Sequence, residues 1–146
     1  MGTGPEYDTL LQQRVALHLE EFVDMPGWMK GEPLFRALQT MDLGASCDPK
    51  NSYNDACTMN KVLEYMAFGK PQVMFDLVES RASADQAGYY VTEVSSRKLA
   101  EAIQHVLDNP ELRRRMAEIG ADRFKKLVDW EESVEQLERA YRLAVS

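Results

Sequence analysis

The sequence predicts an α/β domain built on a doubly wound parallel sheet of about four strands, with three helices at its C-terminal end. Two observations lead to this prediction. Short apolar runs alternate with amphipathic segments along the first part of the chain, and such alternation gives right-handed crossovers and a parallel sheet covered on both faces. After the last apolar run, three helical segments follow one another with no strand between them.

Four short runs are the expected strands, and the first of them is only partly apolar: residues 21–26, 42–47, 72–76 and 88–91. Segments whose apolar residues recur three and four positions apart are the expected helices between them: residues 7–18, 32–41 and 58–67. Two polar stretches are expected to be loops: residues 48–57 and 79–86. Ligands of doubly wound sheets bind beyond the carboxyl ends of the strands, so the loops after the strands are where a site is expected.

Particular residues mark the expected helix ends. Gly69 suits a left-handed stop after the helix that begins near Thr58. Asn109 is the expected cap of a helix whose first residue is Pro110. Asp129 opens the last helix, with Glu132 three places on in a capping box.

The composition is typical of a single acidic globular domain and argues against a nucleic-acid-binding protein. The 146 residues include 17 Lys and Arg against 24 Asp and Glu, a formal charge of −7. This balance argues against nucleic acid as a partner, because nucleic-acid affinity depends on a basic face. With 45% hydrophobic residues, the chain can form the core of one domain. No apolar run is long enough to span a bilayer, and Cys47 and Cys57 are expected to be reduced thiols.

The expected site lies at the start of the helix that follows the 48–57 loop. The backbone N–H groups of Thr58, Met59 and Asn60 would be free at this helix end, which is a favourable place for a phosphate. Thr58 is expected as its cap or in its first turn. Lys61 falls in the first turn, where a cation is unfavourable unless an anion lies in front of it. Lys61 is therefore either a phosphate ligand or an ordinary solvated lysine.

Glu64 and Trp28 are two further candidates for contact with a ligand. A carboxylate such as Glu64 can accept two hydrogen bonds from a vicinal diol such as ribose, although an exposed helix glutamate is the alternative. Trp28 follows an expected strand and could stack on a planar base, but packing is the commoner role of a loop aromatic. Asp55, Glu79 and Arg81 are expected to be solvated loop charges.

Several familiar chemistries have no matching motif. His18 and His105 both fall within expected helices, away from the strand ends. The two cysteines form no CxxC pair, which argues against zinc. There is neither a GxSxG nucleophile elbow nor a GxxxxGK[ST] phosphate loop.

Taken in order, the segments resemble the C-terminal, nucleotide-sugar-binding domain of the retaining GT-B glycosyltransferases of family 4 (glycosyl transferases group 1), a Rossmann-like half of the GT-B fold. The resemblance runs along the whole chain. Its landmarks are GTGPEYDTL at 2–10, MPGWM at 25–29, LFRALQTMDLGASCDP at 34–49, NDACTMNKVLEYMAFGKPQVMFDLVESR at 54–81, LAEAIQHVLDNPELRRRMAEIGADRF at 99–124 and DWEESVEQLERAY at 129–141.

The resemblance implies roles for particular residues. It makes Glu64, in EYMA, the ligand of the ribose hydroxyls. It assigns the diphosphate to the helix start at Thr58, Met59 and Asn60, with the Thr58 hydroxyl as a further contact. Lys61 joins them as a diphosphate ligand because of its place in the first turn of the helix. It puts the nucleobase against residues 27–29: Gly27, Trp28 and Met29. The first glutamate of the family's paired motif would fall at Ala56, and the nearest acid is Asp55, so Asp55 is the only catalytic candidate.

The implied function is transfer of a sugar, of hexosyl type, from a nucleoside diphosphate sugar to an acceptor with retention, in cell-envelope or exopolysaccharide synthesis. No cofactor and no metal are expected. Residues 1–146 would be one nucleotide-sugar-binding domain, truncated before its first strand, and inactive without an N-terminal acceptor domain or a separate acceptor subunit. We expect a cytoplasmic location, and peripheral contact of the protein with the inner face of the membrane is compatible with this expectation. The alternative is a non-catalytic nucleotide- or partner-binding α/β module that works with a separate subunit.

Overall fold

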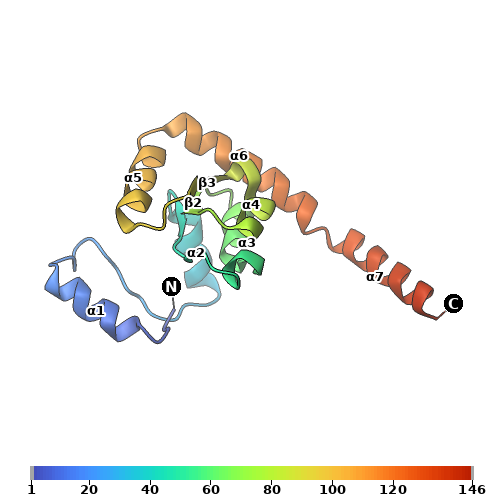
Figure 1. Ribbon diagram of the computed structural model, residues 1–146, viewed down its shortest axis with the longest axis horizontal. Helices are drawn as coiled ribbons and strands as arrows, with labels where there is room; N and C mark the ends of the chain where they lie inside the picture. The colour runs from blue at the N-terminus through green and yellow to red at the C-terminus, as the bar shows by residue number, and fades with distance from the viewer. Residues whose placement is uncertain (1, 146) are drawn as a thin grey trace. The chain divides into compact units, whose positions relative to one another are not determined.

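The computed structural model describes residues 2–145, which form two compact units divided after Thr40. The first unit contains α1 (Tyr7–Ala16) and α2 (Glu32–Thr40), and the second contains the sheet and the remaining helices. Figure 1 shows the elements in colour order from the blue α1 to the red α7.

The first unit has two helices and no strand among its described residues. The expected strand at 21–26 is wrong. The N–H groups of Phe22 and Val23 both donate to the carbonyl of Leu19, at 3.0 and 2.8 Å, which turns the chain back after α1. Phe22 is 81% exposed, so this run lacks the buried side chains that stabilise a strand. His18 lies beyond the end of α1 with a φ of 52°, and not within a helix as expected.

The second unit is built on a parallel sheet of three strands in the order β1 (Gly44–Ser46), β2 (Gln72–Phe75) and β3 (Gly88–Val91). Gly44 pairs with Gln72, and Gln72 pairs with Gly88. Three of the four expected strands are therefore confirmed, close to their expected bounds.

Five helices surround or follow this sheet: α3 (Asn60–Ala67), α4 (Val78–Ala84), α5 (Ser96–Leu107), α6 (Pro110–Leu127) and α7 (Trp130–Ala144). Short 3₁₀ turns occupy Asn54–Ala56 and Asp85–Ala87. The expected loop at 79–86 is wrong, because α4 covers most of it. Ser80, Ser83 and Ala84 are the buried residues of this helix, and their small side chains let it pack closely despite the polar composition of the segment.

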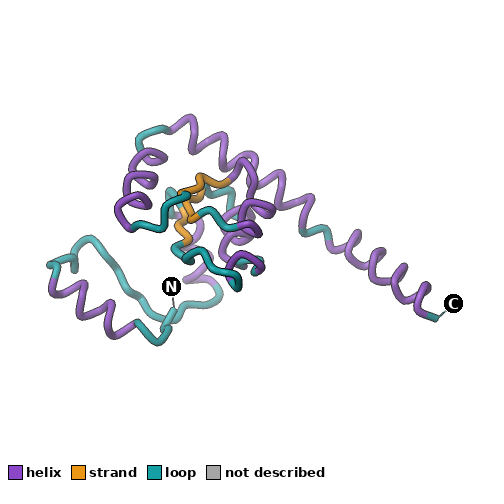
Figure 2. The backbone as a smooth tube through the Cα atoms, viewed as in Figure 1, coloured by secondary structure: helices purple, strands orange, loops and turns teal. Residues whose placement is uncertain are grey.

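Alternate residues of β2 pack into two different clusters. Val73 and Phe75 lie with Leu99 and Val106 of α5, whereas Met74 lies with Met66 of α3. Because successive residues of a strand point to opposite faces, helices cover both faces of the sheet. Figure 2 shows the strands in orange with helices on either side. The doubly wound arrangement expected from the sequence is present with three strands.

The expected helix ends are mostly confirmed. Gly69 has a φ of 60° after α3, the left-handed conformation that glycine adopts without strain. The Asp129 carboxylate accepts hydrogen bonds from the N–H groups of Glu131 and Glu132, at 2.9 and 3.3 Å, and caps α7. Asn109 occupies the cap position of α6, but its amide donates to the carbonyl of His105 instead of capping. In α7 no described residue is buried.

Candidate functional site

The entry to α3 lies at the carboxyl end of the sheet, where a ligand site was expected. Met59, in an extended conformation with φ −82° and ψ 114°, is the cap residue, and no side chain caps this end among the described residues. Thr58 therefore lies before the helix and is not its cap, contrary to the expectation from sequence. Asn60 and Lys61 are the first two residues of the helix, and N–H groups in a first turn without a cap are suited to an anion.

Lys61 is held by a carboxylate from the end of β1. Its ammonium lies 2.7 and 3.0 Å from the two carboxylate oxygens of Asp48, and the hydroxyl of buried Ser46 donates to Asp48 at 2.6 Å. Partial burial works to raise the pKa of Asp48, but the hydrogen bonds from Lys61 and Ser46 outweigh it and hold that pKa below its usual range. Asp48 is thus an ionised partner of Lys61 near neutral pH.

Glu64 lies one turn further along α3 and is exposed. Among the described residues its carboxylate has no hydrogen-bond or ion-pair partner. Residues three apart share a helix face, so Lys61 and Glu64 offer a cation and a free acceptor on one side of α3. Tyr65 next to it points the other way, and its hydroxyl donates to the carbonyl of Ala45 at 3.3 Å.

The charged residues of the neighbouring segments are paired, although they were expected to be solvated. Asp55 accepts a hydrogen bond from the N–H of Val78 at 3.0 Å. The Thr58 hydroxyl, the expected further diphosphate contact, donates to Glu79 at 2.7 Å. Glu79 belongs to α4 and not to a loop, so the entry to α3 is tied to the first turn of α4.

Asp76 and Arg81 form a second ion pair that sequence reasoning missed. The guanidinium donates to both carboxylate oxygens, at 2.7 and 2.9 Å, and its Cζ lies 4.1 Å from the centre of the Tyr90 ring. The hydrogen bonds from Arg81 hold the pKa of Asp76 below its usual range. Asp76 and Arg81 are five residues apart in the sequence. They are recognised as a pair only when residues 78–84 are known to form a helix, because the sequence alone predicts a loop at Arg81.

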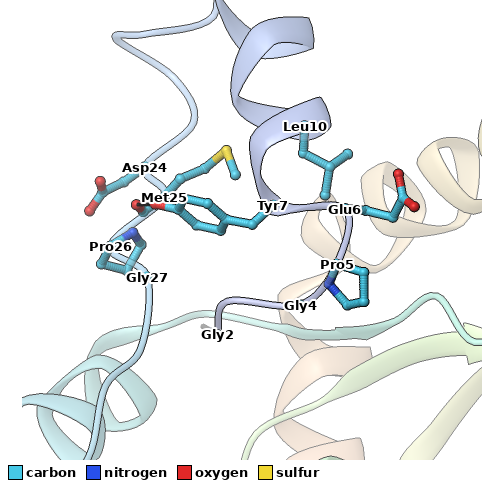
Figure 3. A pocket seen from close by; sticks show the side chains of 10 residues that line it. All are labelled: Gly2, Gly4, Pro5, Glu6, Tyr7, Leu10, Asp24, Met25, Pro26 and Gly27. Carbon is cyan, nitrogen blue, oxygen red and sulfur yellow. Dashed lines mark hydrogen bonds between the residues drawn. The ribbon is translucent and has the colours of Figure 1, made fainter.

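The residues expected to border the base belong to the first unit. Gly27 is buried with a φ of 73°, and Trp28 is 72% exposed. Gly27 lines a pocket of about 300 Å³, shown in Figure 3, together with the turn before α1 and residues 24–26; Trp28 and Met29 do not line it. The hydroxyl of Tyr7 donates to the carbonyl of Met25 at 2.7 Å and holds the two sides of this pocket together.

In residues 2–145 no cluster of three His, Cys, Asp or Glu side chains could hold a metal ion. None of the described helices is both long and apolar enough to cross a membrane.

Comparison with known proteins gives a family and a fold. The sequence model of the family described as glycosyl transferases group 1 matches residues 1–109. The structure is similar to that of a sucrose-phosphate synthase from Thermosynechococcus elongatus, with a TM-score of 0.77 and 22% identity over 99% of this chain. The matched part is 38% of the synthase chain, so the present chain spans well under half the length of that protein. No curated protein matches the sequence significantly.

Proposed function

The chain belongs to the glycosyl transferases group 1 family, and from this premise we propose that it is the donor-binding part of a retaining GT-B glycosyltransferase. The donor is a nucleoside diphosphate sugar. The observation that carries the proposal is the entry to α3 at the carboxyl end of a parallel sheet. There, within residues 2–145, the helix start has no side-chain cap, Lys61 lies in the first turn, and the carboxylate of Glu64 has no hydrogen-bond or ion-pair partner.

Each part of the donor has a proposed contact. The backbone of Met59 and Asn60 and the side chain of Lys61 bind the diphosphate, and the two oxygens of Glu64 accept hydrogen bonds from the ribose hydroxyls. The base is assigned, on the family resemblance, to Gly27, Trp28 and Met29 of the first unit; of these three, Gly27 lines the pocket before α1. The Thr58 hydroxyl already donates to Glu79, so its role at the diphosphate is indirect.

The chemistry of such a site is mainly electrostatic. As the sugar leaves, negative charge grows on the departing diphosphate, and donors that are already in place stabilise it better than water that must reorient. Asp48 reduces the net charge that Lys61 offers, so part of the neutralising charge in the whole protein must come from other groups. Residues that bind the acceptor belong, in this proposal, to another domain or to a separate subunit.

The finer parts of the proposal rest on the family resemblance. They are hexosyl transfer with retention, a role in cell-envelope or exopolysaccharide synthesis, and action in the cytoplasm or at the inner face of the membrane. The proposal includes no metal: the diphosphate ligands that this chain supplies are backbone N–H groups and Lys61.

Isothermal titration calorimetry with UDP, GDP, ADP, CDP and TDP tests donor binding. We expect at least one of them to bind, and Glu64→Ala to weaken that binding about tenfold or more, since hydrogen bonds to a charged acceptor are lost. Glu135→Gln, at an exposed glutamate of α7, is the control and should bind as the parent does. Failure of all five nucleotides to bind would contradict the proposal.

A further inference from the structure

The segment that joins β1 to α3 is ordered by its own side chains. In residues 48–59 the only regular structure is the 3₁₀ turn Asn54–Ala56. The Oδ1 of Asn51 accepts from the N–H of Asn54 at 2.8 Å, and the Asn54 amide donates to the carbonyl of Pro49 at 2.7 Å. These bonds fold the segment on itself and present Asp55 toward the start of α4.

Asp55 acts on a helix that begins 23 residues later in the chain. Its Oδ1 accepts from the N–H of Val78, the first residue of α4, at 3.0 Å. The cap residue of α4, Leu77, has no side-chain oxygen, and Asp55 accepts from one of the N–H groups that the start of this helix leaves free. A negative charge at a helix N-terminus is also favourable.

Two more contacts join the same pair of segments. The Nζ of Lys50 donates to the carbonyl of Asp76 at 3.1 Å and lies 3.6 Å from the Oδ1 of Asp55. The Thr58 hydroxyl donates to Glu79 at 2.7 Å. We call the contacts Lys50–Asp76, Asp55–Val78 and Thr58–Glu79 the bracket; they fix the residues immediately before α3 to the end of β2 and the start of α4.

We propose that Asp55 is a positioning residue of the donor site: through the bracket it holds the entry of α3 in the place where the diphosphate binds. This rests on the proposed function. It replaces the role implied by the family resemblance, in which Asp55 would stand in for a catalytic acid next to the sugar. The Oδ1 of Asp55 is already engaged by the N–H of Val78 and the ammonium of Lys50, which holds the carboxylate against α4.

Two substitutions separate positioning from chemistry. Asp55→Asn keeps an Oδ1 that can accept from Val78, but removes the negative charge and the carboxylate. Asp55→Ala removes the acceptor. If Asp55 positions the loop, Asn should substitute for Asp and Ala should not, whereas a catalytic carboxylate would be lost equally in both.

Cys57 provides a readout that needs no ligand. It is partly buried and lies between Asp55 and Thr58, within the bracket. In a Cys47→Ser background, which leaves Cys57 as the single thiol, we expect Asp55→Ala to raise the rate of labelling by a disulfide reagent about tenfold. Asp55→Asn and the control Asp122→Ala, at an exposed residue of α6, should label within about twofold of the parent.

Nucleoside diphosphate affinity provides the second readout. We expect Asp55→Ala to weaken binding about tenfold, and Asp55→Asn to retain it within about threefold. Thr58→Val removes a different arm of the bracket and should also speed Cys57 labelling; it decides the matter if Asp55→Ala does not fold. Equal behaviour of the Asn and Ala variants, or unchanged labelling in Asp55→Ala and Thr58→Val, would overturn the proposal. If the parent binds no nucleotide, the proposed function fails, and the labelling rates still decide whether the bracket exists.

Discussion

The ammonium of Lys61 lies 2.7 and 3.0 Å from the two carboxylate oxygens of Asp48. The cation that the sequence points to as a phosphate ligand is therefore already paired, and the hydroxyl of Ser46 holds the partner in place. An incoming diphosphate has to share Lys61 with Asp48. This relationship makes Asp48 a residue that sets how strongly the site attracts anions.

Removing the charge of Asp48 should strengthen anion binding. We expect Asp48→Asn to tighten nucleoside diphosphate binding about threefold to tenfold, because the negative charge of Asp48, which repels the diphosphate, is removed. Lys61→Met should weaken binding in either background. Calorimetry at two salt concentrations measures both effects. Asp42→Asn, in the residues that lead into β1 at its other end, is the control; weaker binding by Asp48→Asn than by Asp42→Asn would contradict the prediction.

The pair Asp76–Arg81 should contribute stability that acid removes. Arg81 lowers the pKa of Asp76, so the contribution is fully present above the ordinary pKa of aspartate, about 3.9, and is lost as the pH falls through the lowered value. We expect Arg81→Gln to reduce the free energy of unfolding at pH 7 and to have less effect at pH 3. Urea unfolding at the two pH values checks this, with Arg139→Gln on α7 as the control. An equal loss at both pH values would show that the ion pair is not the cause.

Tyr90 should ionise later than an ordinary tyrosine. Burial raises the pKa of Tyr90 to about 12, and its hydroxyl donates to the carbonyl of Asp85 at 2.8 Å. Stability from the neutral phenol is therefore present below the ordinary tyrosine pKa of about 10 and lost as the pH rises through 12. Phenolate absorbance should show a late-titrating group that is missing in Tyr90→Phe. A titration curve that is the same in shape for both proteins would refute the assignment.

Gly44 should not tolerate a methyl group. A Cβ at this position would overlap the ring of Tyr65, whose Cε2 and Cγ would both lie 2.6 Å away. We expect Gly44→Ala to lower the free energy of unfolding by about 1–3 kcal/mol, the usual cost of overpacking. Gly4→Ala, where a Cβ would meet nothing within 4 Å, is the matched control. Equal urea midpoints for the two variants would show that β1 can move away from Tyr65.

Local sequence signals predicted those elements whose stability depends on their own residues. The runs that became β2 and β3 have the apolar residues that a covered strand needs, and Gly69 and Asp129 stop and start helices through their own backbone or side chain. The prediction of a strand at 21–26 was wrong. A run with apolar residues becomes a strand only beside a partner strand, and none pairs with this run among the described residues. The prediction of a loop at 79–86 was also wrong. Its polar composition indicated a loop, but small polar residues can be buried in a helix that packs closely on its neighbours.

By itself, the sequence determined the α/β class, most element bounds, the helix-end roles of Gly69 and Asp129, and the presence of Lys61 and Glu64 at the start of one helix. Their proposed roles as donor ligands remain predictions. Only the tertiary structure decided the partner of each charged side chain: Asp48 for Lys61, the N–H of Val78 for Asp55, the Thr58 hydroxyl for Glu79, and Asp76 for Arg81. The reason is physical, since a helix or strand signal depends on neighbours within a few residues. An ion pair or hydrogen bond across 13, 21 or 23 residues depends on how the sheet brings its loops together.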